Sequence, residues 1–186
     1  MRAANESEGK KTDMITELAG IDSRFRISVK YAAAEIIKQG SALYNFVLDR
    51  ALRQDGLLAL RCAEACARAS REMREAAKSR SAEIADAVIA GPQEGFDYFL
   101  AEILIHCGVK GARAKKCYHI ISRWLEEETE KGPKACFLEA LYALTEKEKS
   151  LRPKIEREIE KALKSPVPSY SARARRILMK TKRRGL

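Results

Sequence analysis

Aromatic residues, histidines and long apolar runs are scarce in this sequence. Aromatic side chains account for 6% of the 186 residues, and only 2 residues are histidine. No apolar run approaches the roughly 18 residues that a membrane-spanning helix needs. The first residues, MRAANESEGKKTD, contain no apolar segment of the kind found in secretory signals. We therefore expect neither secretion nor a membrane span, and no membrane among the partners.

Catalytic and cofactor-binding motifs are also missing. The sequence contains no Ser/His/Asp set, no phosphate-binding glycine loop and no dinucleotide-binding fingerprint. The acidic run at 126–128 is explained by a charged helix end, because nothing nearby supplies the environment that catalysis by a carboxyl group needs. We therefore predict that the protein is not an enzyme and binds no cofactor, and we see no small-molecule substrate.

The 5 cysteines are an odd number and lack the spacing of a disulfide framework. This usage fits reduced thiols, so we predict a cytoplasmic protein. A zinc site needs four converging ligands. His106 and Cys107 are adjacent, and a helix points adjacent side chains in different directions. The same holds for Cys117 and His119, which a single residue separates, so we expect no metal.

Alanine and charged residues, by contrast, are abundant. Apolar residues make up 46% and charged residues 33% of the chain. These fractions, with few aromatics, favour a core in which helices pack on helices. The length is sufficient for one domain with a sizeable core, and no stretch shows the alternation of a β-strand.

The strongest pattern lies in Gly56–Ser70, GLLALRCAEACARAS. Arg61, Glu64 and Arg68 are spaced three and four apart, and Arg71 follows three positions later. On a helix this spacing gives one narrow charged stripe, and small or apolar residues occupy the rest of the circumference. We therefore expect a helix wedged between neighbouring helices, with the charged stripe exposed.

Helix signals recur along the whole chain. The expected helices span 12–20, 22–39, 41–54, 56–70, 81–90, 96–107, 112–128, 133–145, 153–164 and 169–181, with a charged connector at 71–80. In the second of them we expect the buried residues to be Phe25, Val29, Ala32, Ala33, Ile36 and Ile37. A flexible segment is expected at 1–11, one helical domain at 12–181 and a basic tail at 182–186.

Three of these helices share an opening. Gly56, Gly95 and Gly132 are followed, after eight, seven and seven positions, by Glu64, Glu102 and Glu139. The glutamates are therefore 38 and 37 residues apart, and a helix pair that recurs about every 40 residues is typical of an α-solenoid.

The segments IDSRFRISVKYAAAEII, QDGLLALRCAEACARAS and GPKACFLEALYAL resemble the HEAT-like branch of the armadillo-type repeats. The resemblance covers about residues 13–180. It implies a right-handed α-solenoid of about four to five stacked antiparallel helix pairs that binds a protein partner as a non-catalytic scaffold. HEAT-like DNA alkylation-repair glycosylases offer a catalytic alternative, but Trp124 is the only tryptophan and no set of residues matches their motif.

Family members bind partners along the second helix of each pair. On that basis Lys30, Arg61, Glu64, Arg68 and Arg71 are candidate partner-binding residues. The simpler interpretation, which the pattern favours, is a solvated helix face with ion pairs four residues apart.

Positive charge is concentrated near the end of the sequence. From Arg152 to Leu186 there are twelve Lys or Arg against three Glu, a net charge of +9 out of +10 for the whole chain. The alternative function is therefore nucleic-acid binding by a basic helix. Its candidate phosphate-binding residues are Arg173, Arg175, Arg176, Lys180, Lys182, Arg183 and Arg184. A solvated basic helix end explains the same residues without a ligand.

Overall fold

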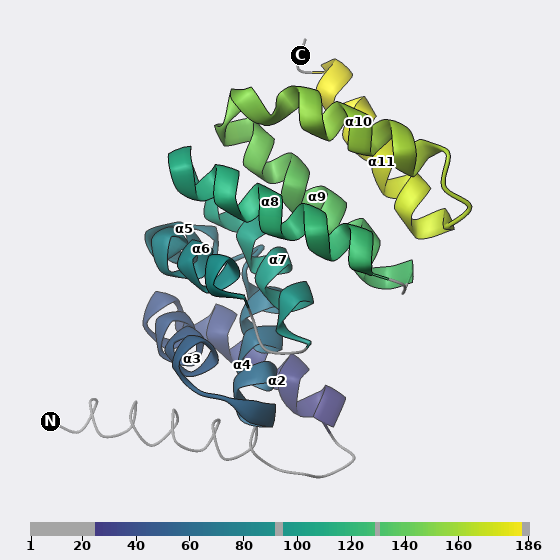
Figure 1. Ribbon diagram of the computed structural model, residues 1–186. Coiled ribbons are helices and arrows are strands. Elements are labelled where there is room, and N and C mark those ends of the chain that lie inside the picture. Colours follow the sequence, from purple (N-terminus) through teal and green to yellow (C-terminus); the bar gives the residue numbers. More distant parts are fainter. Residues whose placement is uncertain (1–24, 92–94, 129–130, 184–186) are drawn as a thin grey trace, which may run out of the picture. The chain divides into compact units, whose positions relative to one another are not determined.

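The protein is all-helical over the part of the chain that the structure describes. A computed structural model describes residues 25–91, 95–128 and 131–183, and no β-strand occurs among them (Figure 1). The helices are α2 Phe25–Gln39, α3 Ser41–Arg53, α4 Gly56–Ala69, α5 Arg74–Ser79, α6 Ser81–Ala90, α7 Phe96–Cys107, α8 Gly111–Glu127, α9 Lys131–Lys147, the 3-10 helix η1 Lys149–Leu151, α10 Arg152–Leu163 and α11 Pro168–Arg183. None of these helices combines the length and apolar character that a membrane crossing requires.

Most predicted boundaries are confirmed. Helices α6 and α7 have the predicted bounds, and α3, α4 and α8–α11 agree with prediction within two residues at each end. The basic tail predicted at 182–186 begins as helix, because α11 continues to Arg183. The segment 1–11, the helix predicted at 12–20 and the side chain of Phe25 lie outside the described residues.

Two local predictions are wrong. The connector predicted at 71–80 contains the short helix α5, in which Ala76 and Ala77 are buried. Two alanines are too few to produce a recognisable apolar period. Ile37 was expected in the core but is 41% exposed. It lies about 100° around α2 from Ile36, and the buried arc of that helix is completed by Val29, Ala32 and Ala33.

The chain forms two compact units that divide between Ala76 and Ala77. In the first unit α4 packs on both α2 and α3. Seven small or apolar residues of α4 are at most 2% exposed, namely Ala59, Cys62, Ala63, Ala65, Cys66, Ala67 and Ala69. The prediction of a helix wedged between neighbours is therefore confirmed, and its small side chains allow the close approach.

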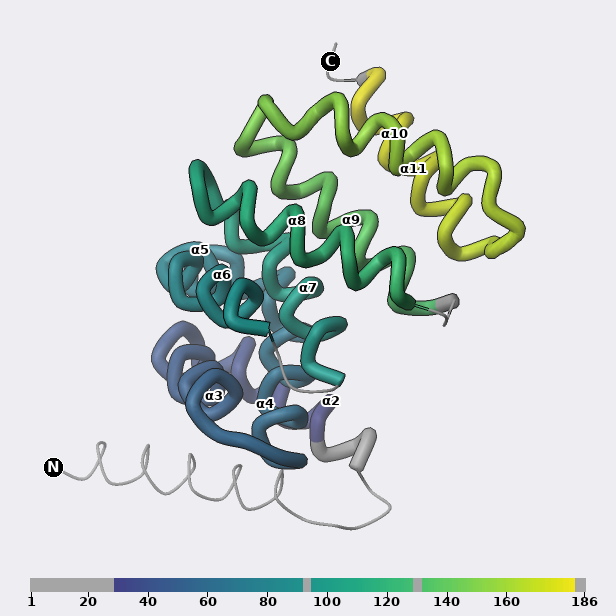
Figure 2. Tube along the Cα trace, viewed as in Figure 1, coloured from purple at the N-terminus to yellow at the C-terminus, as the bar shows by residue number. Residues whose placement is uncertain are grey.

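The second unit contains three helix pairs, which are α6 with α7, α8 with α9, and α10 with α11. The second helices pack without interruption from pair to pair, whereas α10 packs on α9 rather than on the first helix α8. The first helices α6 and α8 pack on each other, and the second helices α7, α9 and α11 pack in sequence (Figure 2). Gly108 ends α7 with a left-handed φ of 68°, a conformation that favours glycine and reverses the chain toward α8.

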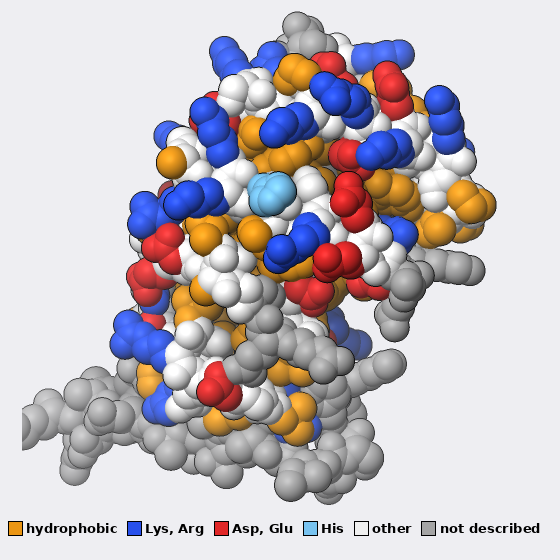
Figure 3. Space-filling view, viewed as in Figure 1, with side chains coloured by type: hydrophobic (Ala, Val, Ile, Leu, Met, Phe, Trp, Pro, Cys, Tyr) orange, Lys and Arg blue, Asp and Glu red, His pale blue; other side chains and the backbone are white. Residues whose placement is uncertain are grey.

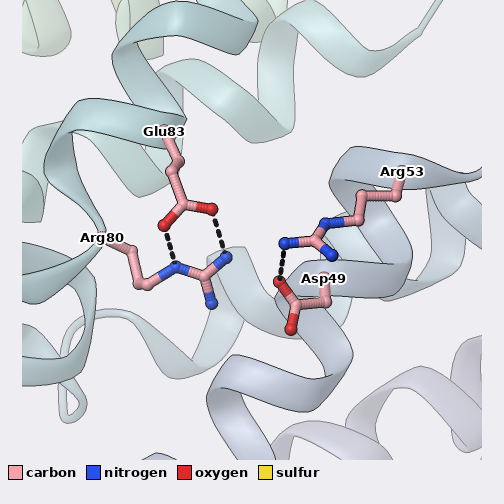
Figure 4. Close-up of polar contacts among 4 residues, drawn as sticks. All are labelled: Asp49, Arg53, Arg80 and Glu83. Atoms are coloured by element: carbon pink, nitrogen blue, oxygen red, sulfur yellow. Dashed lines mark hydrogen bonds and ion pairs between the residues drawn. The ribbon is translucent and has the colours of Figure 1, made fainter.

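Each unit also carries local ion pairs on its helices, two of which are drawn in Figure 4. In the first unit, Arg53 lies 3.7 Å from Asp49 one turn earlier in α3. In the second unit, Arg80 precedes α6 and donates from Nε and Nη2 to Glu83, with both distances 2.6 Å. Such pairs stabilise a helix by only a few tenths of a kcal/mol, roughly 0.2–0.5, so packing determines the fold.

A buried hydrogen bond joins α3 to the end of α4. Tyr44 and Ser70 are both 0% exposed, and their hydroxyl oxygens are 3.0 Å apart. Ser70 donates its single hydroxyl proton to the carbonyl of Cys66 at 2.6 Å, so Tyr44 is the donor to Ser70. The helical period of this segment is carried by Leu43, Phe46, Val47 and Leu48, so the sequence alone did not identify Tyr44 as a core residue.

We predict that Tyr44→Phe lowers the free energy of unfolding by about 1 kcal/mol, because it removes one buried hydrogen bond and little volume. Tyr31→Phe is the matched control, since Tyr31 is 52% exposed and its change should stay within about 0.5 kcal/mol. Urea unfolding of both variants measures the difference. Equal effects of the two substitutions would contradict the role of the Tyr44 hydroxyl.

Candidate partner-binding surfaces

The charged stripe of α4 is only partly exposed. Arg61 was predicted to lie on the exposed stripe, but its side chain is buried, with 4% exposure. The reason is that α4 packs on both α2 and α3, which leaves most of its residues buried, and the long alkyl stem of arginine tolerates such burial. Arg71 lies beyond the last residue of α4, in the following turn. The continuous stripe predicted from spacing is therefore interrupted at Arg61 and ends before Arg71.

Of the remaining residues of this candidate site, Lys30, Arg68 and Arg71 are exposed and Glu64 is half-buried. Arg68 is bound to Glu64 through Nε at 3.0 Å and Nη2 at 2.6 Å, with side-chain exposures of 43% and 14%. This ion pair four residues apart is the one that the simpler interpretation predicts. Lys30 is exposed on α2, which packs directly on α4. The first unit therefore offers Lys30, Glu64 and Arg68 on two adjacent helices.

Helix α11 separates an apolar face from a basic face. Tyr170, Ala174 and Ile177 are buried at successive turns. The opposite face exposes Arg175, Arg176 and Lys182, and none of these three forms an ion pair with a described residue. The side chain of Arg183 and the whole of Arg184 lie outside the described residues. Met179, which is 57% exposed, lies within this basic face.

The other two candidate phosphate-binding residues form ion pairs with a carboxylate of the same chain. Glu139 of α9 forms ion pairs with both Arg173 and Lys180 of α11. The Lys180 nitrogen is 3.3 Å from the carboxylate, and the side chain of Glu139 is 17% exposed. Arg173 and Lys180 are seven residues apart, which places both on the side of α11 that faces α9. The predicted phosphate-binding set is therefore divided into two groups with different surroundings.

The three glutamates of the sequence repeat occupy equivalent positions. Glu64, Glu102 and Glu139 are all half-buried on the second helix of a pair. The residue that follows each of them, Ala65, Ile103 or Ala140, is 0% exposed. The repeat therefore marks the border between the buried and the exposed side of α4, α7 and α9.

A polar groove that the sequence did not predict lies between α8 and α10. Its volume is about 310 Å³, and its basic lining residues are Lys115 and His119 from α8 with Lys154, Arg157 and Lys161 from α10. In Figure 3, Lys and Arg side chains gather over these two helices, with acidic side chains among them. The two sets of residues are about 40 positions apart in sequence, so spacing within one helix gives no sign of the groove.

The thiols serve as small packing residues between helices. All five cysteines lie in the described part of the chain, where each is buried and none is in a disulfide. Three thiols face a backbone carbonyl of the neighbouring helix: Cys66 that of Tyr44, Cys117 that of Ala85 and Cys136 that of Tyr98. Burial raises the pKa of Cys62, Cys117 and Cys136 to about 12.

The cysteines and the tryptophan considered above are packing residues in the described part of the chain. Cys107 and Cys117 are buried, whereas His119 is exposed. Among the described residues, no three His, Cys, Asp or Glu side chains converge as metal ligands would. Trp124 of α8 packs against Phe137 of α9, with ring centroids 5.9 Å apart.

We predict that Glu139→Gln lowers the free energy of unfolding by about 1 kcal/mol at low salt, because two partly buried cations lose their counter-charge. The loss should shrink in about 1 M NaCl, where screening is strong. Glu127→Gln is the control, because Glu127 is 67% exposed and 3.9 Å from Arg123, and its effect should be near zero. A salt-independent loss would show that shape rather than charge holds α9 against α11.

We also predict that the protein loses stability in alkaline solution. Above about pH 8.5 the unfolded chain releases thiol protons that the native chain retains, so the free energy of unfolding falls as pH rises. One such thiol contributes a loss of about 2 kcal/mol between pH 8 and pH 10. Cys117→Ala should reduce the loss by that amount, as measured by urea unfolding under reducing conditions. An unchanged pH dependence in this variant would contradict the prediction.

No protein-family model matches the chain, and no curated protein or solved structure matches it either. The assignment to a family is therefore a proposal that rests on the residues and helix contacts of this chain.

Proposed function

We propose that the protein is a non-catalytic HEAT-like scaffold, a right-handed α-solenoid that binds a protein partner along its second helices. One observation carries this proposal. In the second unit, the second helices α7, α9 and α11 pack one on the next, and the first helices α6 and α8 pack on each other. Repeat proteins bury their cores in this way, and the accessible side of the second helices becomes an extended binding surface.

The chemistry of the second helices supports a protein partner. In the second unit this surface carries Glu139 with Arg173 and Lys180. In the first unit it carries Lys30 on α2 with Glu64 and Arg68 on α4. A surface that carries charges of both signs favours a protein partner with the complementary charges. A partner that placed like charges opposite these residues would be repelled. The buried thiols support a reducing location, and we propose the cytoplasm.

Nucleic-acid binding is the second candidate, and the basic face of α11 favours it. Arg175, Arg176 and Lys182 are exposed there, and no described acidic residue pairs with them. Guanidinium groups bind phosphates well, and binding through phosphates falls steeply as salt rises. The ion pairs of Arg173 and Lys180 with Glu139 reduce the number of cations that this function could use.

The two functions are distinguished by a capture experiment from nuclease-treated extract of the source cells. We predict that Lys30→Glu with Arg68→Glu weakens capture of a protein partner about tenfold or more, as expected for charge reversal inside an interface. Arg53→Glu is the matched control, because Arg53 is 73% exposed on the first helix α3. It should retain the partner.

Two results would contradict the proposed scaffold function. A parallel capture without nuclease that recovers nucleic acid, with steep salt dependence and loss in Arg175→Glu with Arg176→Glu, while the nuclease-treated extract yields no protein, would replace the scaffold function by the second candidate. Equal loss of the partner in the Arg53→Glu control would contradict binding along the second helices.

A further inference from the structure

The groove between α8 and α10 is lined by side chains from both helices. On α8 the residues Lys115, His119 and Ser122 follow one another at intervals of four and three, so they form one stripe. On α10 the residues Lys154 and Arg157 face them at an interval of three. Helix α10 packs on α9 and α11, and the groove of about 310 Å³ separates it from α8.

Tyr118 of α8 also lines this groove, and its hydroxyl is buried. Tyr118 is 4% exposed, and its hydroxyl has no hydrogen-bond partner among the described residues. Burial raises the pKa of Tyr118 well above its ordinary value, and the nearby carboxylate of Glu158 raises it further. The hydroxyl is therefore a donor at neutral pH. A buried donor without a partner destabilises the protein, and a ligand oxygen that reached it from the groove would remove this cost.

The cations of the groove differ in how far they are neutralised. Lys161 is 2.8 Å from Glu158, and Lys115 is 3.9 Å from Glu148. Lys154 and Arg157 are exposed and form no ion pair with a described residue. A compact anion therefore meets two uncompensated cations on α10, together with the hydroxyl of Tyr118.

The acidic lining residues restrict which anion fits. Glu126 and Glu158 also line the groove, so a second phosphate beside the first would meet a carboxylate. A continuous nucleic-acid backbone places phosphates at every nucleotide, whereas a phosphorylated side chain carries one doubly charged group. Basic residues beside that side chain would pair with Glu126 and Glu158. The lining therefore favours a singly phosphorylated peptide with basic neighbours.

We propose that the α8–α10 groove binds a phosphoserine or phosphothreonine of a partner protein, with Lys154, Arg157 and Tyr118 as the phosphate ligands. This inference rests on the proposed function, because it assumes a protein partner. It adds a ligand class and a second contact surface, formed by first helices rather than second helices.

The test uses the full chain and a seven-residue peptide with phosphoserine at its centre and a lysine two positions to each side. We expect it to bind at least tenfold more tightly than the same peptide with serine, as measured by fluorescence anisotropy. In a parallel NMR titration, the ring signals of His119 and the amide of Ser122 should shift. Inorganic phosphate should produce the same shifts at higher concentration.

Two variants locate the site. Lys154→Glu with Arg157→Glu should weaken phosphopeptide binding tenfold or more, and Tyr118→Phe should weaken it several-fold. Lys116→Glu is the matched control. Lys116 is exposed on α8, the helix that carries Tyr118, but it does not line the groove, and its charge lowers the pKa of Asp86 instead. It should change binding less than twofold. Circular dichroism of each variant verifies the helical fold.

Several results would overturn the inference. These are equal affinity for the serine and phosphoserine peptides, equal weakening by Lys116→Glu, or absence of shifts at His119 with inorganic phosphate on the unchanged protein. Tighter binding of a 15-nucleotide single-stranded RNA to the same residues would replace the phosphopeptide by nucleic acid. Because this test uses no captured partner, its failure leaves the capture result for Lys30 and Arg68 standing as separate evidence.

Discussion

Close contact between helices through very small side chains is the constraint on which this structure depends. Five of the helices each bury an alanine: Ala32 in α2, Ala63 in α4, Ala101 in α7, Ala140 in α9 and Ala174 in α11, all at most 1% exposed. Larger side chains at these positions would force the helices apart and strain the core. The scarcity of aromatic residues and the abundance of alanine have this single physical cause.

The distribution of charge follows from the same packing. Helices that approach closely leave narrow exposed strips, so charged residues collect on a few surfaces. Where a strip borders another helix, as at Glu139 beside α11, cations are neutralised within the protein. Where packing leaves a groove, as between α8 and α10, Lys154 and Arg157 remain exposed to solvent. The net charge therefore says less about binding than the position of each cation relative to the nearest carboxylate.

The sequence predicts the helices well and the surfaces poorly, for a physical reason. Helix period and glycine ends are local properties, and they locate α6 and α7 without knowledge of neighbours. Exposure of a polar residue depends on which helix packs over it. Arg61 belongs to a regular charged stripe and is nevertheless buried, and the α8–α10 groove requires residues from two helices. Such properties arise only when helices are placed together.

The cysteines have a consequence for measuring how the chain opens. Cys62 and Cys66 lie in α4, Cys107 in α7, Cys117 in α8 and Cys136 in α9, so the thiols are distributed over four helices. Each can meet an alkylating reagent only after its own helix separates from its neighbours, because every one is buried. The native sequence thus contains a set of kinetic reporters. Their individual modification rates would give a free energy of opening for each of these helices, without any introduced label.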